Sequence, residues 1–417
     1  MPNFFLQLLD VSLEFFYAYC GECGSVTELL IGIFNGLSIG SVLLLSALGL
    51  AIAFGLMGVI NLAHGELMML GAYTTFVVQN VFRSFGEPWF NLYILFALPI
   101  AFLVTAAVGF GLERGVIRYL YGRPLETLLA TWGVSLILQQ FVRSVNWAIA
   151  AGLTAFLLKD VIRWLVLKVL SWKSFDHEKI RHGFQQWAIP AGLFLGFGVL
   201  FGINQTANTT LTRPWFSARN VDVTAPKWLQ GGISFGTAQL PYSRIFIIVL
   251  TLICLAGMYW FLNKSNWGLR IRAVTQNRQM SACLGIPTAK VDALTFALGS
   301  GLAGIAGVAI ALLGSVGPNT GQNYIVDAFM VVVVGGVGNL LGTILAAMGL
   351  GIINYLIGSG TFVTLFTKMQ APDFFTEIAS FFATTSMAKV MAFALIITFL
   401  QFRPAGLFPP KGRTAEL

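Results

Sequence analysis

The sequence predicts an all-α, polytopic transmembrane helical bundle, and three observations support this fold class. The chain of 417 residues is 57% hydrophobic and only 10% charged, whereas soluble domains carry roughly 25% charged residues. Several segments continue for about 18 or more residues with almost no charge, the length that an α-helix needs to cross a bilayer. These runs are continuous rather than alternating, which does not fit a transmembrane β-barrel.

About nine to eleven membrane segments are expected, and two of them differ from the others. The run at 325–337 is short enough for a re-entrant half-helix, which is tolerated where protein or water covers its ends. The run at 150–170 contains Lys159 and Asp160, so it is also a candidate for an interfacial helix. The complete set of apolar runs is 29–56, 62–82, 90–112, 126–147, 150–170, 186–203, 241–262, 291–316, 325–337, 340–358 and 387–402.

Basic residues between the runs predict how the chain is oriented. They cluster at 114–123, 264–278 and 403–413, and the positive-inside rule places such clusters in the cytoplasm. The N-terminus is then external and the C-terminus cytoplasmic. The external segments are predicted to be 204–240, an exposed turn at 314–323 and a loop at 359–386.

The same composition excludes several classes of function. The net charge of +8 comes from residues in short loops, so it indicates membrane orientation rather than nucleic-acid binding. No GxxxxGK[ST] P-loop occurs in the sequence, so any ATP must be used by another protein. The chain has three histidines and no HExxH motif. We therefore expect no metal, no cofactor and no enzymatic activity.

The stretch GLMGVINLAHGELMMLGAY (55–73) places Asn61, His64 and Glu66 in an apolar region, and two interpretations remain open. In the first, Gly58 weakens one helix, Asn61 caps the next, and Glu66 lies at its positive dipole end. His64 then donates to a neighbouring carbonyl. In the second, the helix is interrupted so that its polar groups bind a solute, as in many transporters. Asn61 and His64 would share a helix face, and the three residues would line a substrate pathway.

Small residues recur at four-residue spacing in two places. One series contains Gly299, Ala303 and Gly307, and the other contains Gly338 and Gly342. Such series allow helix backbones to approach closely in a membrane. We therefore interpret them as helix-packing residues rather than as the lining of a pore.

The predicted cytoplasmic segment KSNWGLRIRAVTQNRQMSACLGIP (264–287) has the pattern of a partner-binding helix. Ile271, Val274, Met280 and Cys283 could form one apolar stripe, with Arg272, Gln276 and Arg278 on the opposite face. A short amphipathic helix of this kind suits the groove of another protein.

Four stretches of the sequence resemble one family of membrane proteins. They are GLRIRAVTQNRQMSACLGIPTAKVDALTFALGSGLAGIAGV, LGLAIAFGLMGVINLAHGELMMLGAY, RPLETLLATWGVSLILQQ and VVVVGGVGNLLGTILAAMGLGIIN. The chain resembles the permease subunits of branched-chain-amino-acid-type ABC importers over about 30–147 and 216–408. Within that family it looks most similar to the urea permease subunit.

The resemblance implies a multi-pass protein of the bacterial inner membrane that forms part of a pathway for urea or a related small amide. It implies four kinds of neighbour: a second homologous permease, two cytoplasmic ATP-binding subunits, a periplasmic solute-binding protein and the lipid bilayer. The alternatives are a branched-chain or other amino acid as cargo, or a stand-alone urea channel or secondary carrier. The residues implied in coupling to the ATPase are Arg272, Gln276, Asn277, Arg278, Ala282 and Gly285.

The resemblance also suggests how the chain is divided. Family members usually join LILQQFVRSV to NVDVTAPKWLQGGI through a short loop, whereas about 70 residues intervene here, so an inserted helical hairpin is predicted. The predicted parts are an N-terminal interfacial segment (1–28), the first half of the permease domain (29–147), the insertion (148–215), the second half (216–408) with a coupling loop at 264–290, and a cytoplasmic tail (409–417).

Overall fold

The computed structural model describes residues 23–144, 219–235, 238–368 and 373–408. The chain forms two compact units, one of residues 1–135 with 222–417 and the other of residues 136–221. Of the second unit, the structure describes the last turns of one helix and residues 219–221. The predicted insertion, nearly all of the N-terminal interfacial segment and the C-terminal tail therefore lie outside the described residues.

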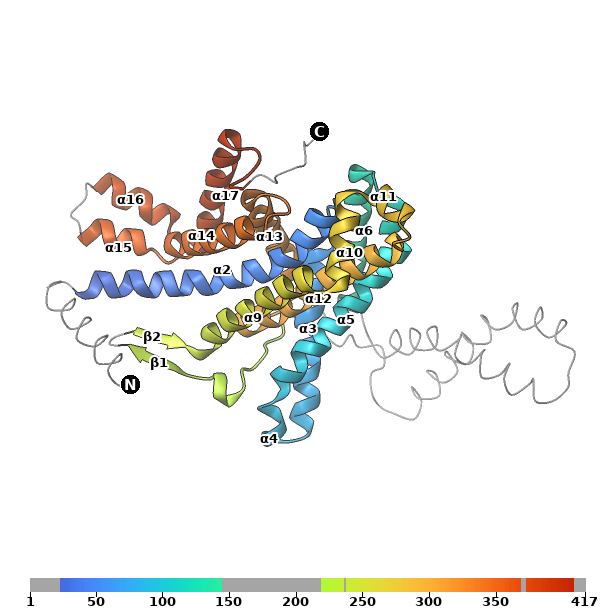
Figure 1. Cartoon of the computed structure of the whole chain (residues 1–417). Coiled ribbons are helices and arrows are strands. Elements are labelled where there is room, and N and C mark those ends of the chain that lie inside the picture. Colours follow the sequence, from blue (N-terminus) through green and yellow to red (C-terminus); the bar gives the residue numbers. More distant parts are fainter. Residues whose placement is uncertain (1–22, 145–218, 236–237, 369–372, 409–417) are drawn as a thin grey trace, which may run out of the picture. The chain divides into compact units, whose positions relative to one another are not determined.

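The larger unit is built from helices, which confirms the predicted fold class (Figure 1). A single antiparallel hairpin, β1 (Gly232–Phe235) with β2 (Ala238–Pro241), is the only sheet among the described residues. The main helices are α2 (Cys23–Met57), α3 (His64–Ser84), α5 (Tyr93–Gly115), α6 (Pro124–Ser144), α9 (Tyr242–Lys264), α10 (Asn266–Gln276), α11 (Arg278–Cys283), α12 (Thr288–Leu313), α13 (Thr320–Gly335), α14 (Leu340–Gly358) and α17 (Thr385–Phe402).

Six of the described helices are long and apolar enough to cross a membrane, namely α2, α5, α6, α9, α12 and α14. Three further predicted runs are also helical. They correspond to α3, which carries charged residues, to α13, which has 16 residues, and to α17, whose apolar part is Met387–Phe402. The runs at 150–170 and 186–203 lie outside the described residues, and whether α13 is re-entrant stays a prediction.

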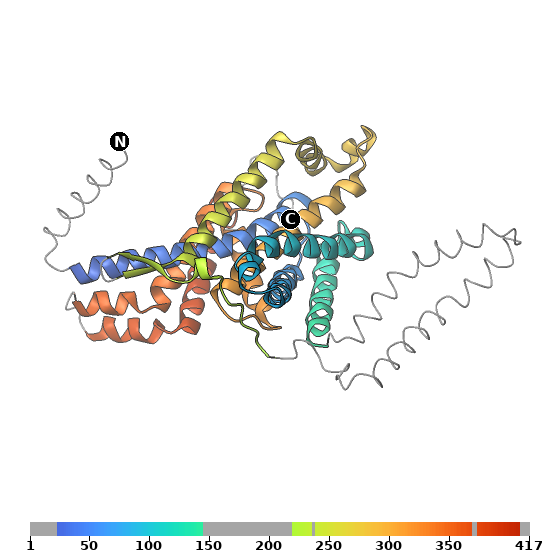
Figure 2. The same ribbon diagram turned by 90° about the horizontal axis from the view of Figure 1, so that it is seen from below.

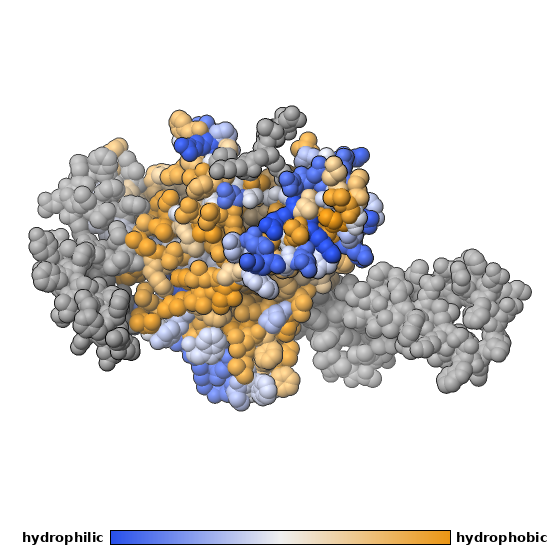
Figure 3. All heavy atoms as spheres, in the orientation of Figure 1, coloured by the Kyte–Doolittle hydropathy of each residue, from blue (hydrophilic) through white to orange (hydrophobic). Residues whose placement is uncertain are grey.

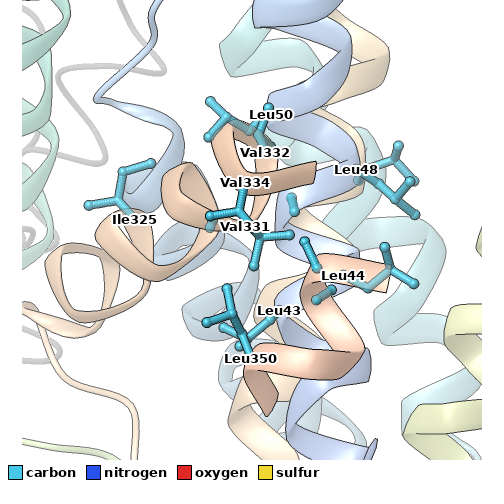
Figure 4. Packing of buried hydrophobic residues seen from close by; sticks show 14 of the residues in the cluster. Leu43, Leu44, Leu48, Leu50, Ile325, Val331, Val332, Val334 and Leu350 are labelled. Atoms are coloured by element: carbon cyan, nitrogen blue, oxygen red, sulfur yellow. The ribbon is translucent and has the colours of Figure 1, made fainter. Parts of the chain in front are cut away.

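Helix α2 lies at the centre of the larger unit and packs against α9, α12, α13 and α14. Its side chains Leu43, Leu44 and Leu48 enter a buried cluster with Val331 and Val334 of α13 (Figure 4). Elements far apart in the sequence therefore share one apolar core.

Glycines bring several of these helices into backbone contact. A Cβ on Gly36 of α2 would lie 2.6 Å from the Ile352 Cα of α14, and one on Gly40 would lie 2.9 Å from the Ala347 carbonyl oxygen. In the first predicted series, a Cβ on Gly299 would lie 2.8 Å from the Gly49 carbonyl oxygen, and Gly307 lies against the backbone of α3. Ala303 is fully buried.

The second series is arranged differently from the expectation. Gly342 lies in α14 and packs against Gly335 of α13. Gly338 precedes α14 and has a φ of +85°, so it belongs to a turn rather than to a helical stripe. It still contributes to packing, because a Cβ on Gly55 of α2 would lie 2.7 Å from its Cα.

The two ends of the larger unit have different elements. The β-hairpin and the short helix α15 (Thr361–Lys368) lie beside the beginning of α2 (Figure 2). Together with α16 (Asp373–Phe382), α15 replaces the loop expected at 359–386. Hydrophilic residues gather over α10 and α11 (Figure 3). The end of the larger unit that carries these two helices, Asn266–Gln276 and Arg278–Cys283, is called the basic end. The charge pattern predicts that the basic end is cytoplasmic.

Adding a methyl group at Gly307 tests the glycine packing. The new Cβ of Gly307→Ala would meet the backbone of Met68 and Ala72, and overpacking of this kind costs about 1–3 kcal/mol. We expect a lower midpoint of thermal unfolding in detergent. The matched control is Gly257→Ala in α9, where nothing lies within 4 Å of the added Cβ. An equal response of the two variants would contradict the proposed backbone contact.

Candidate functional site

The polar stretch singled out in the sequence forms a break between α2 and α3. Helix α2 ends at Met57, and Gly58 follows with a φ of +68°, which favours glycine. The Asn61 Oδ1 accepts a hydrogen bond from the Ala63 backbone N–H at 3.0 Å, and α3 begins at the next residue. Asn61 therefore caps the turn that leads into α3. It does not share a helix face with His64, contrary to the expectation, because it precedes the helix.

The His64 ring is buried where three helices meet. It is 1% exposed, and its Nε2–H donates to the Ser46 carbonyl oxygen of α2 at 3.0 Å. The ring lies beside Gly49, where a Cβ would be 2.7 Å from His64 Cε1, and Gly49 in turn contacts Gly299. Gly299 is near the middle of α12 (Thr288–Leu313). The break thus lies level with the centre of a membrane-spanning helix.

Helix α6 supplies polar partners to the break. The Ser135 hydroxyl donates to Oε1 of Glu66 at 3.1 Å, and Glu66 is 1% exposed in the first turn of α3. The Thr131 Oγ1 accepts from the Leu62 backbone N–H at 3.2 Å. A carboxylate near the start of a helix is stabilised by the positive end of the helix dipole. Ser135 and Thr131 were not predicted as site residues. They are far from the break along the chain, so the sequence does not indicate that they contact it.

The beginning of α13 lies against the beginning of α3. Gly65 and Gly321 are each the second residue of their helix, and their backbones are in direct contact. The preceding residues Val316, Gly317 and Pro318 are buried, so the prediction of an exposed turn at 314–323 is wrong for this part. The chain folds back into the protein here. Two helix N-termini, each with a positive dipole end, therefore meet beside the break.

One hydrogen-bond donor at the break is unsatisfied within the described part of the chain. The Asn61 amide nitrogen Nδ2 is buried and has no hydrogen-bond partner within the described part of the chain. Leaving a buried donor unsatisfied costs about 1–3 kcal/mol. Such a group inside a membrane transporter is a candidate contact for a polar solute.

The segment 264–290 forms two helices instead of the single helix that was expected. They are α10 (Asn266–Gln276) and α11 (Arg278–Cys283), separated at Asn277, whose Oδ1 accepts from the Met280 backbone N–H at 2.9 Å. The predicted apolar stripe divides between the two helices. Ile271 and Val274 of α10 are buried, whereas Met280, 60% exposed, and Cys283 lie on the surface. Leu284, which was not part of the predicted stripe, is 77% exposed.

The predicted coupling residues have distinct positions in these helices. Arg272, Gln276 and Ala282 are exposed, and Gly285 ends α11 with a φ of +80°. Arg278 is exposed as well, and it also forms an ion pair with Asp292 of α12, the Nη2 to Oδ2 distance being 2.6 Å.

A tyrosine that the sequence analysis did not single out completes this polar cluster. The Arg278 guanidinium carbon lies 4.5 Å from the centre of the Tyr121 ring, and the Tyr121 hydroxyl donates to Oε1 of Glu113 at 3.2 Å. Burial raises the pKa of the Tyr121 phenol well above its usual range, so the hydroxyl keeps its proton. In the sequence, only the position of Glu113 and Asp292 near the ends of apolar runs indicated that a polar cluster could form here.

Comparison with known proteins agrees with this architecture. The family model described as "Branched-chain amino acid transport system / permease component" matches residues 32–160 and 188–400. The chain belongs to this permease family. The gap at 161–187 falls inside the predicted insertion, which stays a prediction.

Two curated relatives match the permease along nearly their whole length. The high-affinity branched-chain amino acid transport system permease protein BraD of Pseudomonas aeruginosa is 27% identical over 89% of this chain and 93% of its own. The corresponding protein LivH of Escherichia coli K12 is 24% identical over 90% of this chain and 93% of its own. The fructose import permease protein FrcC of Rhizobium meliloti is 23% identical over 62% of this chain and 77% of its own. No solved structure matches the permease.

These relatives decide several of the expectations. The permease is a multi-pass protein of the bacterial inner membrane and a transport component rather than an enzyme. Membership of the branched-chain amino acid permease family is confirmed. The narrower expectation of urea as cargo is not supported, and the alternative of a branched-chain amino acid is closer to the relatives.

Replacing Asn61 measures the capping bond. Asn61→Ala removes the acceptor for the Ala63 N–H in the turn before α3, and loss of such a hydrogen bond costs about 0.5–1.5 kcal/mol. We expect a lower thermal midpoint in detergent. Asn61→Ser, which keeps a side-chain oxygen at the same position, should unfold near the wild-type temperature. If the alanine variant is as stable as the wild type, the capping role is wrong.

Proposed function

We propose that this permease subunit carries a branched-chain or similar amino acid across the inner membrane as part of an ATP-driven importer. The observation that carries the proposal is the match to relatives named as branched-chain amino acid permeases, along 93% of their length. A match over the whole transmembrane region supports a shared cargo class better than short motifs do.

The chemistry of the break supports such a cargo. A zwitterionic amino acid has a cationic and an anionic group close together and a side chain without charge. Glu66 offers a carboxylate, and the beginnings of α3 and α13 offer the positive ends of helix dipoles. Asn61 and His64 add neutral polar groups. We propose that Asn61, His64 and Glu66 line the substrate pathway at this position.

The energy for transport comes from other proteins in this proposal, because the sequence has no P-loop. The partners are a second homologous permease, two cytoplasmic ATP-binding subunits and a periplasmic solute-binding protein. Met280 and Leu284 are exposed beside hydrophilic residues at the basic end. This arrangement suits insertion of α11 into an apolar groove of an ATPase, with Arg272, Gln276 and Ala282 around it.

Urea is the second candidate cargo, and one observation favours it. The stretches YGRPLETLLATWGVSLILQQ and AVTQNRQMSACLGIP resemble the urea permease subunit of the same family. Urea is uncharged and forms several hydrogen bonds, so it would need the amide of Asn61 more than the carboxylate of Glu66.

Uptake by the complete importer in proteoliposomes distinguishes the candidates. We expect ATP-dependent entry of radiolabelled leucine that excess isoleucine or valine suppresses and excess urea does not. Suppression by urea alone would favour the second candidate. Saturable entry through this chain alone, without nucleotide, would show a channel or secondary carrier and would contradict the proposal.

A substitution that separates capping from solute contact tests the pathway. Asn61→Ser keeps an acceptor but lacks the amide nitrogen, so we expect about two- to tenfold slower uptake, the value of one hydrogen bond, at normal abundance in the membrane. The matched control is Asn80→Ser, since Asn80 is exposed on α3, the helix that follows Asn61. Wild-type uptake by Asn61→Ser would remove Asn61 from the pathway.

A further inference from the structure

The polar cluster around Arg278 connects three segments at the basic end. Arg278 is the first residue of α11, Asp292 lies in the first part of α12, and Tyr121 follows the short helix η1 (Ile117–Leu120) after α5. The ion pair with Asp292 and the stacking on Tyr121 are made by the same guanidinium group. Tyr121 extends the connection to Glu113 of α5 through its hydroxyl.

The cluster contains two buried carboxyl groups, and Arg278 forms an ion pair with one of them. Glu113 is 1% exposed and the Asp292 side chain 7%, whereas Arg278 remains 44% exposed. The two carboxylates repel each other, and removing a cation from a buried carboxylate is strongly unfavourable. The arrangement therefore favours keeping the start of α11 beside α5 and α12.

Helices α5 and α12 form a closely packed pair beyond the cluster. A Cβ on Gly301 of α12 would lie 2.6 Å from Phe102 Cδ2, and one on Gly304 would lie 2.6 Å from the Ala101 carbonyl oxygen. Gly307, one helical turn further along α12, contacts α3. Packing of this density transmits displacement instead of absorbing it. A movement of α11 would thus be passed to α5 and α12, and through α12 to the start of α3.

We propose that Tyr121, Glu113 and Asp292 are positioning residues that tie α11 through Arg278 to the α5–α12 pair, so that movement of α11 drives these helices. The proposal rests on the proposed function, because it takes α11 as the helix that meets the ATPase. In this proposal Arg278 holds α11 to α12 through its ion pair with Asp292 and does not act by direct contact with the ATPase. The ATPase-facing surface of α11 is then formed by Met280, Ala282 and Leu284.

The test measures ATP hydrolysed per solute transported, using the complete importer in proteoliposomes. Asp292→Asn and Tyr121→Leu should raise this ratio by about fivefold or more, the lower range of a coupling free energy. ATP hydrolysis itself should persist. The exchanged pair Arg278→Asp with Asp292→Arg should bring the ratio back towards the wild-type value. Arg123→Gln is the control, because it breaks the exposed Arg123–Glu126 pair without touching α11.

Each outcome decides the question. An unchanged ratio in Asp292→Asn overturns the proposal, and so does a raised ratio that the exchanged pair fails to lower, because the ion pair would then matter only for folding. If Asp292→Asn does not accumulate in the membrane, Tyr121→Leu takes its place. An unchanged ratio in Tyr121→Leu then overturns the proposal. Failure of the proposed function is separate, since the wild-type importer would then show no ATP-dependent uptake at all.

Discussion

Backbone contact between helices is the constraint on which the rest of this permease depends. Water does not drive apolar helices together inside a bilayer, so packing must come from close approach of the helices themselves. Gly36 and Gly40 of α2 supply that approach towards α14, and Gly299 and Gly307 of α12 supply it towards α2 and α3. A side chain at these positions would separate the helices and with them the polar groups that they carry.

The polar break can exist at this depth because the same contacts enclose it. Gly49 leaves room for the His64 ring, and Gly65 with Gly321 brings the beginnings of α3 and α13 together. The Leu62 backbone N–H in the interruption finds an acceptor in Thr131 of α6, and the His64 side chain bonds the Ser46 carbonyl oxygen of α2. Hydrogen-bonding groups near the middle of the membrane are thus supported by tight packing on every described side. The α11 cluster follows the same logic, since the Arg278 guanidinium pairs with the buried Asp292 carboxylate and the Tyr121 hydroxyl donates to the buried Glu113 carboxylate.

The sequence was sufficient for the fold class, because apolar length and low charge determine what can cross a bilayer. It also located the end of α2 at Met57 and the turn at Asn61, since glycine and asparagine act on their own neighbours, but the N-cap of α3 is Ala63 rather than the expected Asn61. It could not show Ser135 beside Glu66 or Tyr121 beneath Arg278, since these pairs depend on tertiary packing between distant segments. The buried residues 316–318 were misassigned for the same reason: Gly, Pro and Ser indicate a turn, and only the position of α3 shows that the turn is covered.

The pairing of α2 with α14 has a consequence for biogenesis. The first long helix to leave the ribosome takes a partner that is made almost last, and at about 5–20 residues per second the interval is on the order of tens of seconds. During that time the groove along Gly36 and Gly40 faces lipid or an insertion factor. The contact of α2 with α14 is therefore completed late, after α9, α12 and α13, the other helices that pack against α2, have been made.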